Sequence, residues 1–335
     1  MATQIHSSQA AGTPSPRYTE PADDPFSSVH RLSSSSSSAG IDTDGHSIMT
    51  APPPYDATAT PFLPTLQLQI ETPGKPLLSL PLPPRPDPIP IFTIPTTDSL
   101  TPSYLSLRPT RSSGSSFLIS PSASDPSSDE HSPLSTTTYR FGPGRPPTIR
   151  LFLPGTTPAT SNPFLPDPDH SSSPEDVDLS TWDTFPMTSP SLLSRTTAFR
   201  TRLGTFQWRY ASRSERKLLT PVPSSLLILD RIVKIAVAQP PGSRSSKRSD
   251  EIRTPIAQLV RSDEYRTEGS SCRSAGNGGR LLVDLRVWEE EGEKTEREMA
   301  VVMAVTTGLV MLKKEVDRRR AQQIMVMAGA AGGGS

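Results

Sequence analysis

The sequence predicts a mainly β domain: a closed antiparallel barrel of about twelve strands around one hydrophobic C-terminal helix. Two observations lead to this prediction. Many short segments between Pro61 and Trp288 have the apolar pattern of strands, and the last long segment, residues 296–327, begins with a run that is apolar on every side. A helix of that kind needs a surrounding core, and a sheet closed around it buries the helix while removing exposed strand edges.

Composition indicates that only part of the chain belongs to this domain. Of the 335 residues, 39 are proline and only 33% are hydrophobic, which indicates one folded domain accompanied by disordered sequence. Residues 1–60 are predicted to be a disordered Ser/Pro-rich arm because they contain few large apolar side chains. The domain is predicted at 61–327, followed by a disordered tail at 328–335. Solvated Ser- and Pro-rich inserts are expected near 121–135, 155–178 and 239–250.

The predicted strands follow from period-two alternation or from short apolar runs. Leu66–Ile70 alternates apolar and polar residues, as a half-buried strand does. Leu226–Ala238 is nearly continuously apolar at its start, so we expect it to be buried on both faces or to form two strands. Prolines place the first strands at sheet edges, and Asn277–Gly279 is a hairpin signal. The other predicted strands are Ile89–Ile94, Tyr104–Leu107, Ser116–Ile119, Thr137–Phe141, Thr148–Phe152, Thr196–Arg200, Gly204–Ala211, Ile256–Arg261 and Arg280–Trp288.

The final helix is predicted over residues 296–327. Glu296 places negative charge in its first turn, where the helix dipole favours it, and Glu315 precedes Arg319 by four residues, the supporting orientation for a helical ion pair. As a helix, the apolar run Met299–Leu312 would span only about 21 Å, short of the roughly 30 Å of a bilayer core. We therefore expect this run to form the core of the barrel and not a membrane anchor.

Charge, cysteine content and the first residues limit the classes of function. The formal net charge is +0, so the electrostatics of the whole chain favour neither nucleic acid nor membrane. Cys272 is the only cysteine, which excludes an intrachain disulfide and a cysteine-rich metal site. Residues 1–8 lack the basic and apolar regions of a signal peptide. We expect a soluble monomer without a transmembrane segment or nucleic-acid partner, in the cytoplasm, with the nucleus and the membrane periphery as alternatives.

The histidines argue against enzymatic chemistry. His6, His30, His46, His131 and His170 all lie in segments predicted to be disordered or loop, so none is expected in a preorganised site. We therefore predict no catalytic residue, no cofactor, no metal and a protein that is not an enzyme. An enzyme that uses Asp or Glu residues is the alternative, and it would require carboxylates that converge in a pocket.

The sharpest interaction motif is Pro52-Pro53-Pro54-Tyr55 in the predicted arm. Pro-Pro-x-Tyr is the ligand pattern of WW domains, which grip a polyproline helix and hold the tyrosine in a pocket. Pro52, Pro53 and Tyr55 are the predicted contact residues. The leading hypothesis is a non-enzymatic adaptor that recruits a WW-domain ubiquitin ligase, and a chance match in a proline-rich chain is the competing explanation.

A basic and aromatic segment provides the second hypothesis, peripheral binding of an anionic membrane lipid such as a phosphoinositide. The aromatic residues Phe206, Trp208 and Tyr210 alternate with polar ones, which a strand with its aromatic side chains in the core also explains. The predicted lipid-contacting residues are Arg209, Arg213, Arg216 and Lys217, to which Lys247 and Arg248 could add.

Two further motifs have structural explanations. Gly276–Gly279 lacks the Gly-Lys-Ser/Thr ending of a phosphate loop and precedes a strand, so a turn is favoured. Lys313–Arg320 has the basic character of a nuclear-localisation or nucleic-acid patch, but Glu315 and Asp317 interrupt it. This pattern favours a solvated helix end at the point where the buried half emerges, so any function of the helix is expected there.

Arg280–Leu285 followed by Met299–Leu312, after about a dozen short strands, resembles the element order of one known group. This is the group of tubby C-terminal, phospholipid-scramblase and LURP-one-related proteins, whose fold is a twelve-stranded barrel around a C-terminal helix. Gly204–Tyr210 and Met311–Glu315 are similar to segments of uncharacterised proteins of filamentous fungi. The resemblance would cover residues 61–327 and implies phosphoinositide binding, as in tubby proteins, or membrane association, as in scramblases. No tubby signature motif and no calcium loop of the scramblase kind accompanies it.

Overall fold

The computed structural model describes residues 61–82, 86–95, 101–110, 113–121, 133–140, 145–152, 182–191, 194–236, 249–288 and 294–332. The chain divides into two units, Met1–Pro54 and Tyr55–Ser335, and all described residues belong to the second. The Pro52–Tyr55 motif, the five histidines and the greater part of each predicted insert lie outside the described residues. The predictions for those segments therefore stay predictions.

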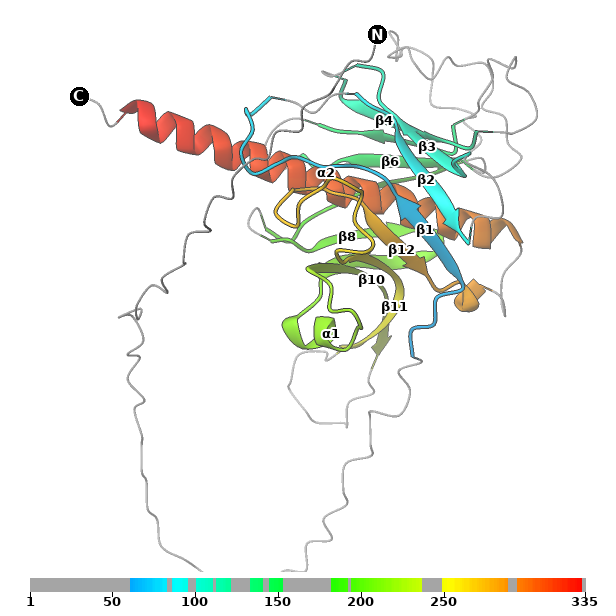
Figure 1. Cartoon of the computed structure of the whole chain (residues 1–335). Coiled ribbons are helices and arrows are strands. Elements are labelled where there is room, and N and C mark those ends of the chain that lie inside the picture. The colour runs from blue at the N-terminus through cyan, green and yellow to red at the C-terminus, as the bar shows by residue number, and fades with distance from the viewer. Residues whose placement is uncertain are drawn as a thin grey trace, which may run out of the picture. The chain divides into compact units, whose positions relative to one another are not determined.

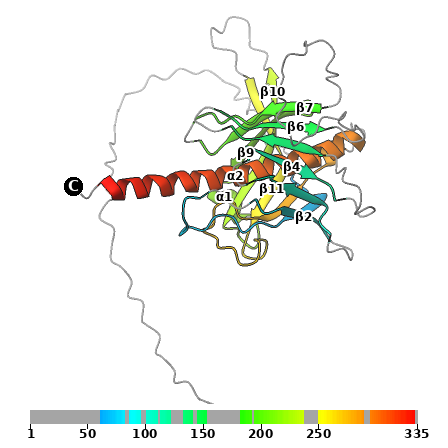
Figure 2. The same ribbon diagram turned by 90° about the horizontal axis from the view of Figure 1, so that it is seen from above.

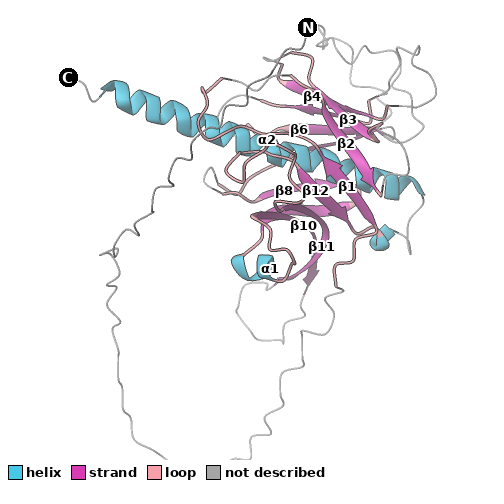
Figure 3. Ribbon diagram, in the orientation of Figure 1, coloured by secondary structure: helices cyan, strands magenta, loops and turns pink. Residues whose placement is uncertain are grey.

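Twelve antiparallel strands form one sheet in the order β7-β6-β5-β4-β3-β2-β1-β12-β11-β10-β9-β8. The end strands β7 and β8 meet through a bridge between Thr188 and Ala198, so the sheet curls into a nearly closed barrel. Figures 1 and 3 show the strands arranged around the long helix α2. The strands are β1 (Leu66–Ile70), β2 (Ile89–Ile94), β3 (Tyr104–Leu107), β4 (Ser115–Ile119), β5 (Ser135–Thr138), β6 (Thr148–Phe152), β7 (Trp182–Pro186), β8 (Thr197–Thr201), β9 (Gly204–Tyr210), β10 (Ser225–Ala236), β11 (Ser249–Arg261) and β12 (Gly279–Val283).

Helix α2 (Lys294–Gly332) confirms the predicted central helix and its burial. Every residue from Met299 to Leu312 is buried, and the helix continues beyond the barrel at its C-terminal end (Figure 2). The threonines of the apolar run are satisfied inside the core. Trp208 Nε1 donates to Thr307 Oγ1 at 2.9 Å, Thr307 Oγ1 donates to the Met303 carbonyl at 2.7 Å, and the hydroxyls of Ser135 and Thr306 lie 2.7 Å apart. The buried hydroxyls of this run therefore each have a hydrogen-bond partner.

β10 confirms the prediction that its apolar run is buried on both faces. Leu227 and Leu229 belong to the main core, whereas Leu226 and Ile228 point the other way into a small outer cluster with Val260. The run forms one strand, with a register shift between Leu229 and Asp230. The outer cluster is covered by the segments that follow β9 and β11.

Several predicted boundaries were wrong. β5 begins at Ser135, two residues before the predicted Thr137–Phe141, because its inward side chains are the hydroxyls of Ser135 and Thr137 and carry no apolar alternation. β12 ends at Val283 and is followed by a short 3-10 helix, η1 (Arg286–Trp288). The strand β7 and the helix α1 (Arg213–Lys217) were not predicted. β11 starts at Ser249, inside the insert expected at 239–250.

The prediction that prolines confine the first strands to edges was also wrong. β1 and β2 lie in the middle of the strand order, and β2 contains Pro90. The Pro90 carbonyl accepts from the Glu71 N–H at 3.0 Å, one residue beyond the end of β1. In an antiparallel sheet, the N–H and the C=O of one residue point toward the same neighbouring strand. An N–H at position 90 would therefore point toward the chain just after β1, where the hydrogen-bonded ladder has already ended, so the N–H that proline lacks is not needed for that ladder.

The hairpin predicted at Asn277–Gly279 was wrong as well. β11 and β12 do pair, but residues 262–278 connect them. The glycines serve close backbone approach, because a Cβ on Gly278 would lie 2.0 Å from the Ile70 carbonyl oxygen and one on Gly279 would lie 2.5 Å from that of Val260. Two glycines therefore let β1 and β11 approach the start of β12.

Candidate functional site

Many of the charged side chains in the described residues lie where α2 leaves the barrel. Leu312 is the last residue of the continuous buried run, and the next three, Lys313, Lys314 and Glu315, are half-buried. Strand ends and loops from many parts of the chain surround this turn of the helix. We call the residues around Lys313–Arg320 the helix exit.

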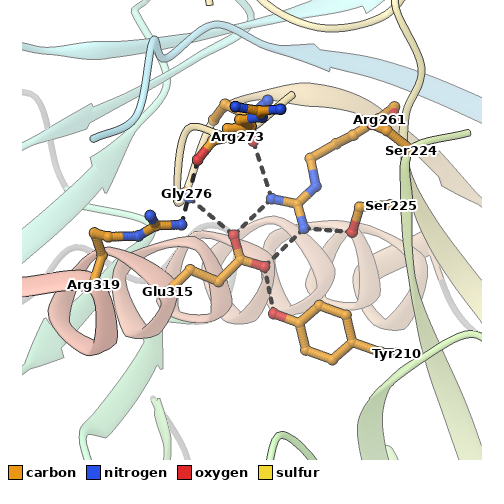
Figure 4. A network of polar contacts seen from close by, with 9 residues as sticks. Tyr210, Ser224, Ser225, Arg261, Arg273, Gly276, Glu315 and Arg319 are labelled. Carbon is orange, nitrogen blue, oxygen red and sulfur yellow. Dashed lines mark hydrogen bonds and ion pairs between the residues drawn. The ribbon is translucent and has the colours of Figure 1, made fainter. Parts of the chain in front are cut away.

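Glu315 fixes the helix at the exit (Figure 4). Its carboxylate accepts two parallel bonds from Arg261, each 2.7 Å long, and a third bond of 2.9 Å from the Gly276 N–H. The Tyr210 hydroxyl donates a short hydrogen bond to the same carboxylate. Arg261 also donates to Ser225 Oγ at 2.8 Å, so one helix residue joins β9, β10, β11 and the loop before β12.

The electrostatics of this network are those of a buried ion pair, in which each charge faces its counter-charge. Burial alone would raise the pKa of Glu315, but the hydrogen bonds and charge of Arg261 outweigh it and hold that pKa below its usual value. Burial, and then the negative charge of Glu315, raise the pKa of Tyr210. Glu315 is thus held ionised and Tyr210 protonated near neutral pH, and both groups position α2 in the barrel.

A first cavity, of about 460 Å³, lies on one side of the exit and is lined by four cationic residues: Arg145, Arg195, Lys314 and Arg318. Lys314 Nζ donates to the hydroxyls of Ser189 and Thr197, each at 3.0 Å. Burial, and then the charge of Arg318, lower the pKa of Lys314 to about 8. The carboxylates on this wall, Glu315 and Asp317, are each paired with a cation, so the cavity presents excess positive charge.

A second cavity, also of about 460 Å³, lies on another side of the exit and is mainly apolar. Leu309, Leu312 and Val316 contribute the helix side of its wall. Lys313 Nζ lies 4.6 Å from the centre of the Tyr139 ring and the Arg108 guanidinium carbon lies 5.9 Å from it. Two cations therefore share one aromatic ring at the edge of an apolar space.

A leucine-rich strap, residues 76–82, runs beside the emerging helix. Lys75 Nζ donates to the carbonyls of Leu80 at 2.7 Å and Leu82 at 3.3 Å. Arg320 Nε donates to the Pro81 carbonyl at 3.3 Å and Gln323 donates to the Leu77 carbonyl at 3.0 Å. The backbone of the strap is thus held to the helix while its leucine side chains are exposed, Leu78 to 93%.

The projecting end of α2 carries a second exposed apolar group. Ile324, Met325, Val326 and Met327 follow the basic exit, and each is at least 50% exposed. We call these four residues the helix tip. Among the described helices, none has an apolar stretch of the length that a bilayer crossing requires. The exit therefore combines cations with exposed apolar side chains on the helix tip and the strap.

The structure places the predicted basic lipid-contacting residues elsewhere, on β9 and α1. Arg209 donates to Asp230 at 2.6 Å and to Glu215 at 3.0 Å, so its charge is already paired. Arg213 and Lys217 are exposed on α1, and Arg216 donates to the Ser224 carbonyl at 3.0 Å. Helix α1 forms because Ser212 and Glu215 make a capping box. None of the four predicted residues lines either cavity.

Other predicted motifs have clear places in the structure. Phe206 and Trp208 are fully buried, which confirms the core explanation for these aromatic residues. Gly276 offers its N–H to Glu315. Lys247 and Arg248 lie outside the described residues, as do the contact residues of the Pro-Pro-x-Tyr motif. Within the described ranges, no group of three or more His, Cys, Asp or Glu side chains is gathered as metal ligands.

Part of the helix exit has a local signal in the sequence. The basic pattern of Lys313–Arg320 predicts the place where the buried helix emerges. The apolar tetrad Ile324–Met327 directly after it, and the leucines of residues 77–82, were visible but had no assigned role. Their proximity follows from the barrel topology, which brings the strap beside α2 across more than two hundred residues.

Comparisons with protein-family models, with curated proteins and with solved structures find no match. The nearly closed barrel around a C-terminal helix is compatible with the tubby and scramblase architecture that the element order resembles, and it does not identify that family.

Proposed function

We propose that this protein binds peripherally to membranes that contain anionic phospholipid, with the helix exit facing the lipid. One observation carries the proposal: the exposed apolar helix tip and the exposed leucines of the strap lie next to the cations of the helix exit. Adjacent apolar and cationic groups of this kind match the acyl boundary and the headgroup layer of an anionic bilayer.

The charge at the exit supports this orientation. Four cations line the first cavity, and Arg319 and Arg320 follow on the helix. Each Lys or Arg close to an anionic surface contributes about 1 kcal/mol of attraction, and stable peripheral binding requires a second, apolar contribution. The helix tip and the strap supply that second contribution.

The geometry favours shallow insertion. From Ala321 to Gly332 the helix rises by about 18 Å at about 1.5 Å per residue, with the apolar tetrad in the first half of that length. If the tetrad enters the acyl boundary, Arg318, Arg319 and Arg320 stand about one or two turns behind it. That distance places their guanidinium groups at the level of lipid phosphates, which they can bind in a bidentate manner.

Vesicle co-sedimentation tests the proposal. The full chain should bind phosphatidylcholine vesicles that contain phosphatidylserine or a phosphoinositide, and binding should weaken as salt is raised because screening reduces headgroup attraction. The double variant Met325→Glu with Val326→Glu should lose at least tenfold in affinity. Leu63→Glu and Ile252→Glu are the controls, since both side chains are exposed and lie away from the exit. Leu63 lies beside Asp284, after the end of β12, and Ile252 precedes Arg261 by nine residues along β11.

Two results would contradict the proposal. One is equal binding by the tip variant and the controls, which would leave the tip without a role. The other is binding that is independent of anionic lipid and of salt. If binding is lost only when Arg213, Arg216 and Lys217 are replaced, the lipid site is the basic segment predicted from the sequence and not the helix exit.

A second candidate function is recruitment of a WW-domain ubiquitin ligase through Pro52–Tyr55. The motif itself favours it, because it supplies both the polyproline turn and the tyrosine that WW domains require. A peptide of residues 40–65 should bind a panel of WW domains, and Tyr55→Ala should abolish that binding. Equal binding of both peptides would remove this candidate.

A further inference from the structure

The second cavity at the helix exit has the form of a ligand site. Its volume of about 460 Å³ falls in the range of small-molecule sites. Its helix wall consists of Leu309, Leu312 and Val316, all buried. Ile89 and Leu107 line it from β2 and β3, and Leu80 and Leu82 of the strap line it from the loop side. Such walls suit a hydrocarbon ligand.

The polar groups of this cavity are concentrated around one aromatic ring. Tyr139 is flanked by Lys313 at 4.6 Å and Arg108 at 5.9 Å. Among the residues that the structure describes, no carboxylate pairs with Arg108, whereas Lys313 pairs with Asp317 at 2.5 Å. Lys75 also lines the cavity, but its ammonium is occupied by the strap carbonyls. Arg108 is therefore the cation available to a ligand, with Lys313 beside it.

These charges select the head group. The Arg108 guanidinium can form two parallel hydrogen bonds to one carboxylate, and Lys313 adds a partly neutralised positive charge. Glu71 and Asp87 also line the cavity, and their negative charges oppose a second negative charge on the ligand. A monoanionic carboxylate fits this balance better than a phosphate dianion. The cavity volume suits one hydrocarbon chain and not the two chains of a diacyl lipid.

We propose that this cavity binds a long-chain fatty acid, with its carboxylate at Arg108 and Lys313 and its hydrocarbon chain along Leu309, Leu312 and Val316. The site is separate from the membrane-facing helix tip and needs no vesicle to fill it. Binding transfers the chain from water to an apolar wall and gives Arg108 a counter-ion.

The test is a titration of the full chain with oleate labelled with ¹³C at the carboxyl carbon, below the concentration at which oleate forms micelles. NMR should show one saturable site with a shifted carboxyl resonance. Arg108→Leu should weaken binding at least tenfold, and Lys313→Met should weaken it less, because Asp317 already shares that charge. Arg200→Leu and Lys294→Met are the matched controls, as both remove an exposed cation away from the cavity.

Two additional arms make the test specific. Leu80→Trp adds bulk to the cavity wall from an exposed position of the strap, so it should reduce oleate binding while leaving thermal unfolding unchanged. Oleyl alcohol, which lacks the anionic head, should bind at least tenfold more weakly than oleate, and oleyl phosphate should also bind more weakly. The tip variant Met325→Glu with Val326→Glu should bind oleate normally, so that a failure of membrane binding and a failure of this site are distinguishable.

The proposal is overturned by any of three results: no saturable site for oleate, oleyl alcohol binding as tightly as oleate, or Arg108→Leu binding like Arg200→Leu. Tighter binding of oleyl phosphate than of oleate would replace the carboxylate by a phosphate ligand and contradict the charge argument.

Discussion

Two parts of helix α2 contain the same kinds of side chain and have opposite surroundings. Met299–Leu312 and the helix tip Ile324–Met327 are both rich in methionine and valine, yet the first is buried throughout and the second is exposed. About three helical turns separate them, and these turns contain Glu315, which pairs with Arg261 of β11. Apolar residues on this helix therefore have two roles, and the ion pair at the exit lies between the two parts of the helix.

The largest expected difference between the two parts comes from the same substitution in each. Val305 is 0% exposed, so Val305→Asp places an unpaired charge in the core and should cost more than about 4 kcal/mol, enough to unfold the domain. Val326 is 73% exposed, so Val326→Asp should change the free energy of unfolding by no more than about 0.5 kcal/mol. Thermal unfolding followed by circular dichroism measures both. A folded Val305→Asp protein would mean that the helix is not enclosed.

The boundary itself is tested by removing one charge of its ion pair. Glu315→Gln leaves Arg261 buried without a counter-charge and should destabilise the protein by about 3–5 kcal/mol. Asp317→Asn, two residues further on, removes a more exposed partner and should cost no more than about 1 kcal/mol. Chemical denaturation of both variants gives the comparison. Equal effects would show that Glu315 does not anchor the helix.

The same ion pair predicts a dependence of stability on pH. Because the folded pKa of Glu315 is lowered, its contribution is present above the ordinary value of 4.5 and is lost as the pH falls below it toward the folded value. Between pH 6 and pH 3 the wild type should therefore lose more stability than Glu315→Gln. Asp284, whose pKa is held down by Arg286 despite its burial, acts in the same direction in both proteins and does not affect the difference.

Two glycines differ in the same way, since one is enclosed in the barrel and the other lies on the projecting helix. Gly278→Ala would place a Cβ 2.0 Å from the Ile70 carbonyl and should destabilise the barrel by about 1–3 kcal/mol. Gly329, on the projecting helix, has nothing within 4 Å of an added Cβ. Gly329→Ala should therefore leave global stability unchanged and raise local helix stability by about 1 kcal/mol. Hydrogen exchange of the amides after residue 320 would detect the local gain, and global unfolding would detect the loss.

The smallest expected effect concerns the charge of the exit. With a pKa lowered to about 8, Lys314 is a cation at pH 7 and largely neutral at pH 9. If the exit faces anionic lipid, vesicle affinity should fall across this interval by about fivefold, which corresponds to about 1 kcal/mol per charge. Lys314→Met should bind more weakly at pH 7 and lose most of this pH dependence. An unchanged pH profile would place Lys314 away from the lipid.

Much of the fold could be predicted from the sequence because its main elements carry local signals. Leu66–Ile70 has a period-two pattern. Met299–Leu312 is apolar on every side and too short to span a bilayer, which indicates a helix enclosed by protein. The strand pattern misplaced β5, whose inward residues are hydroxyls. For β2 the predicted bounds were correct, and only its expected place at a sheet edge was wrong, because Pro90 lies beyond the end of the β1 ladder. In those places, tertiary context decides the structure.

The candidate site was less predictable because it depends on contacts between distant residues. Glu315 and Arg261 are 54 positions apart, and Gln323 and Leu77 are 246 apart. The spacing in the sequence predicts a helical ion pair between Glu315 and Arg319. In the structure, the Glu315 carboxylate instead accepts hydrogen bonds from Arg261, Tyr210 and Gly276. Similarly, Arg209 had the sequence context of a lipid contact, and only the fold shows that Asp230 and Glu215 already pair with it.

The position of α2 in the chain has a consequence for synthesis. The helix follows all twelve strands, so every strand is synthesised before the residues that fill the interior of the barrel. β1 also lacks one of its two neighbouring strands until β12 is synthesised, since the two pair along their whole length. Until the last segment is translated, the strands have partners for some of their backbone groups but nothing to pack against. Chaperones would therefore meet this domain with all of its strands synthesised and the centre of its sheet still missing.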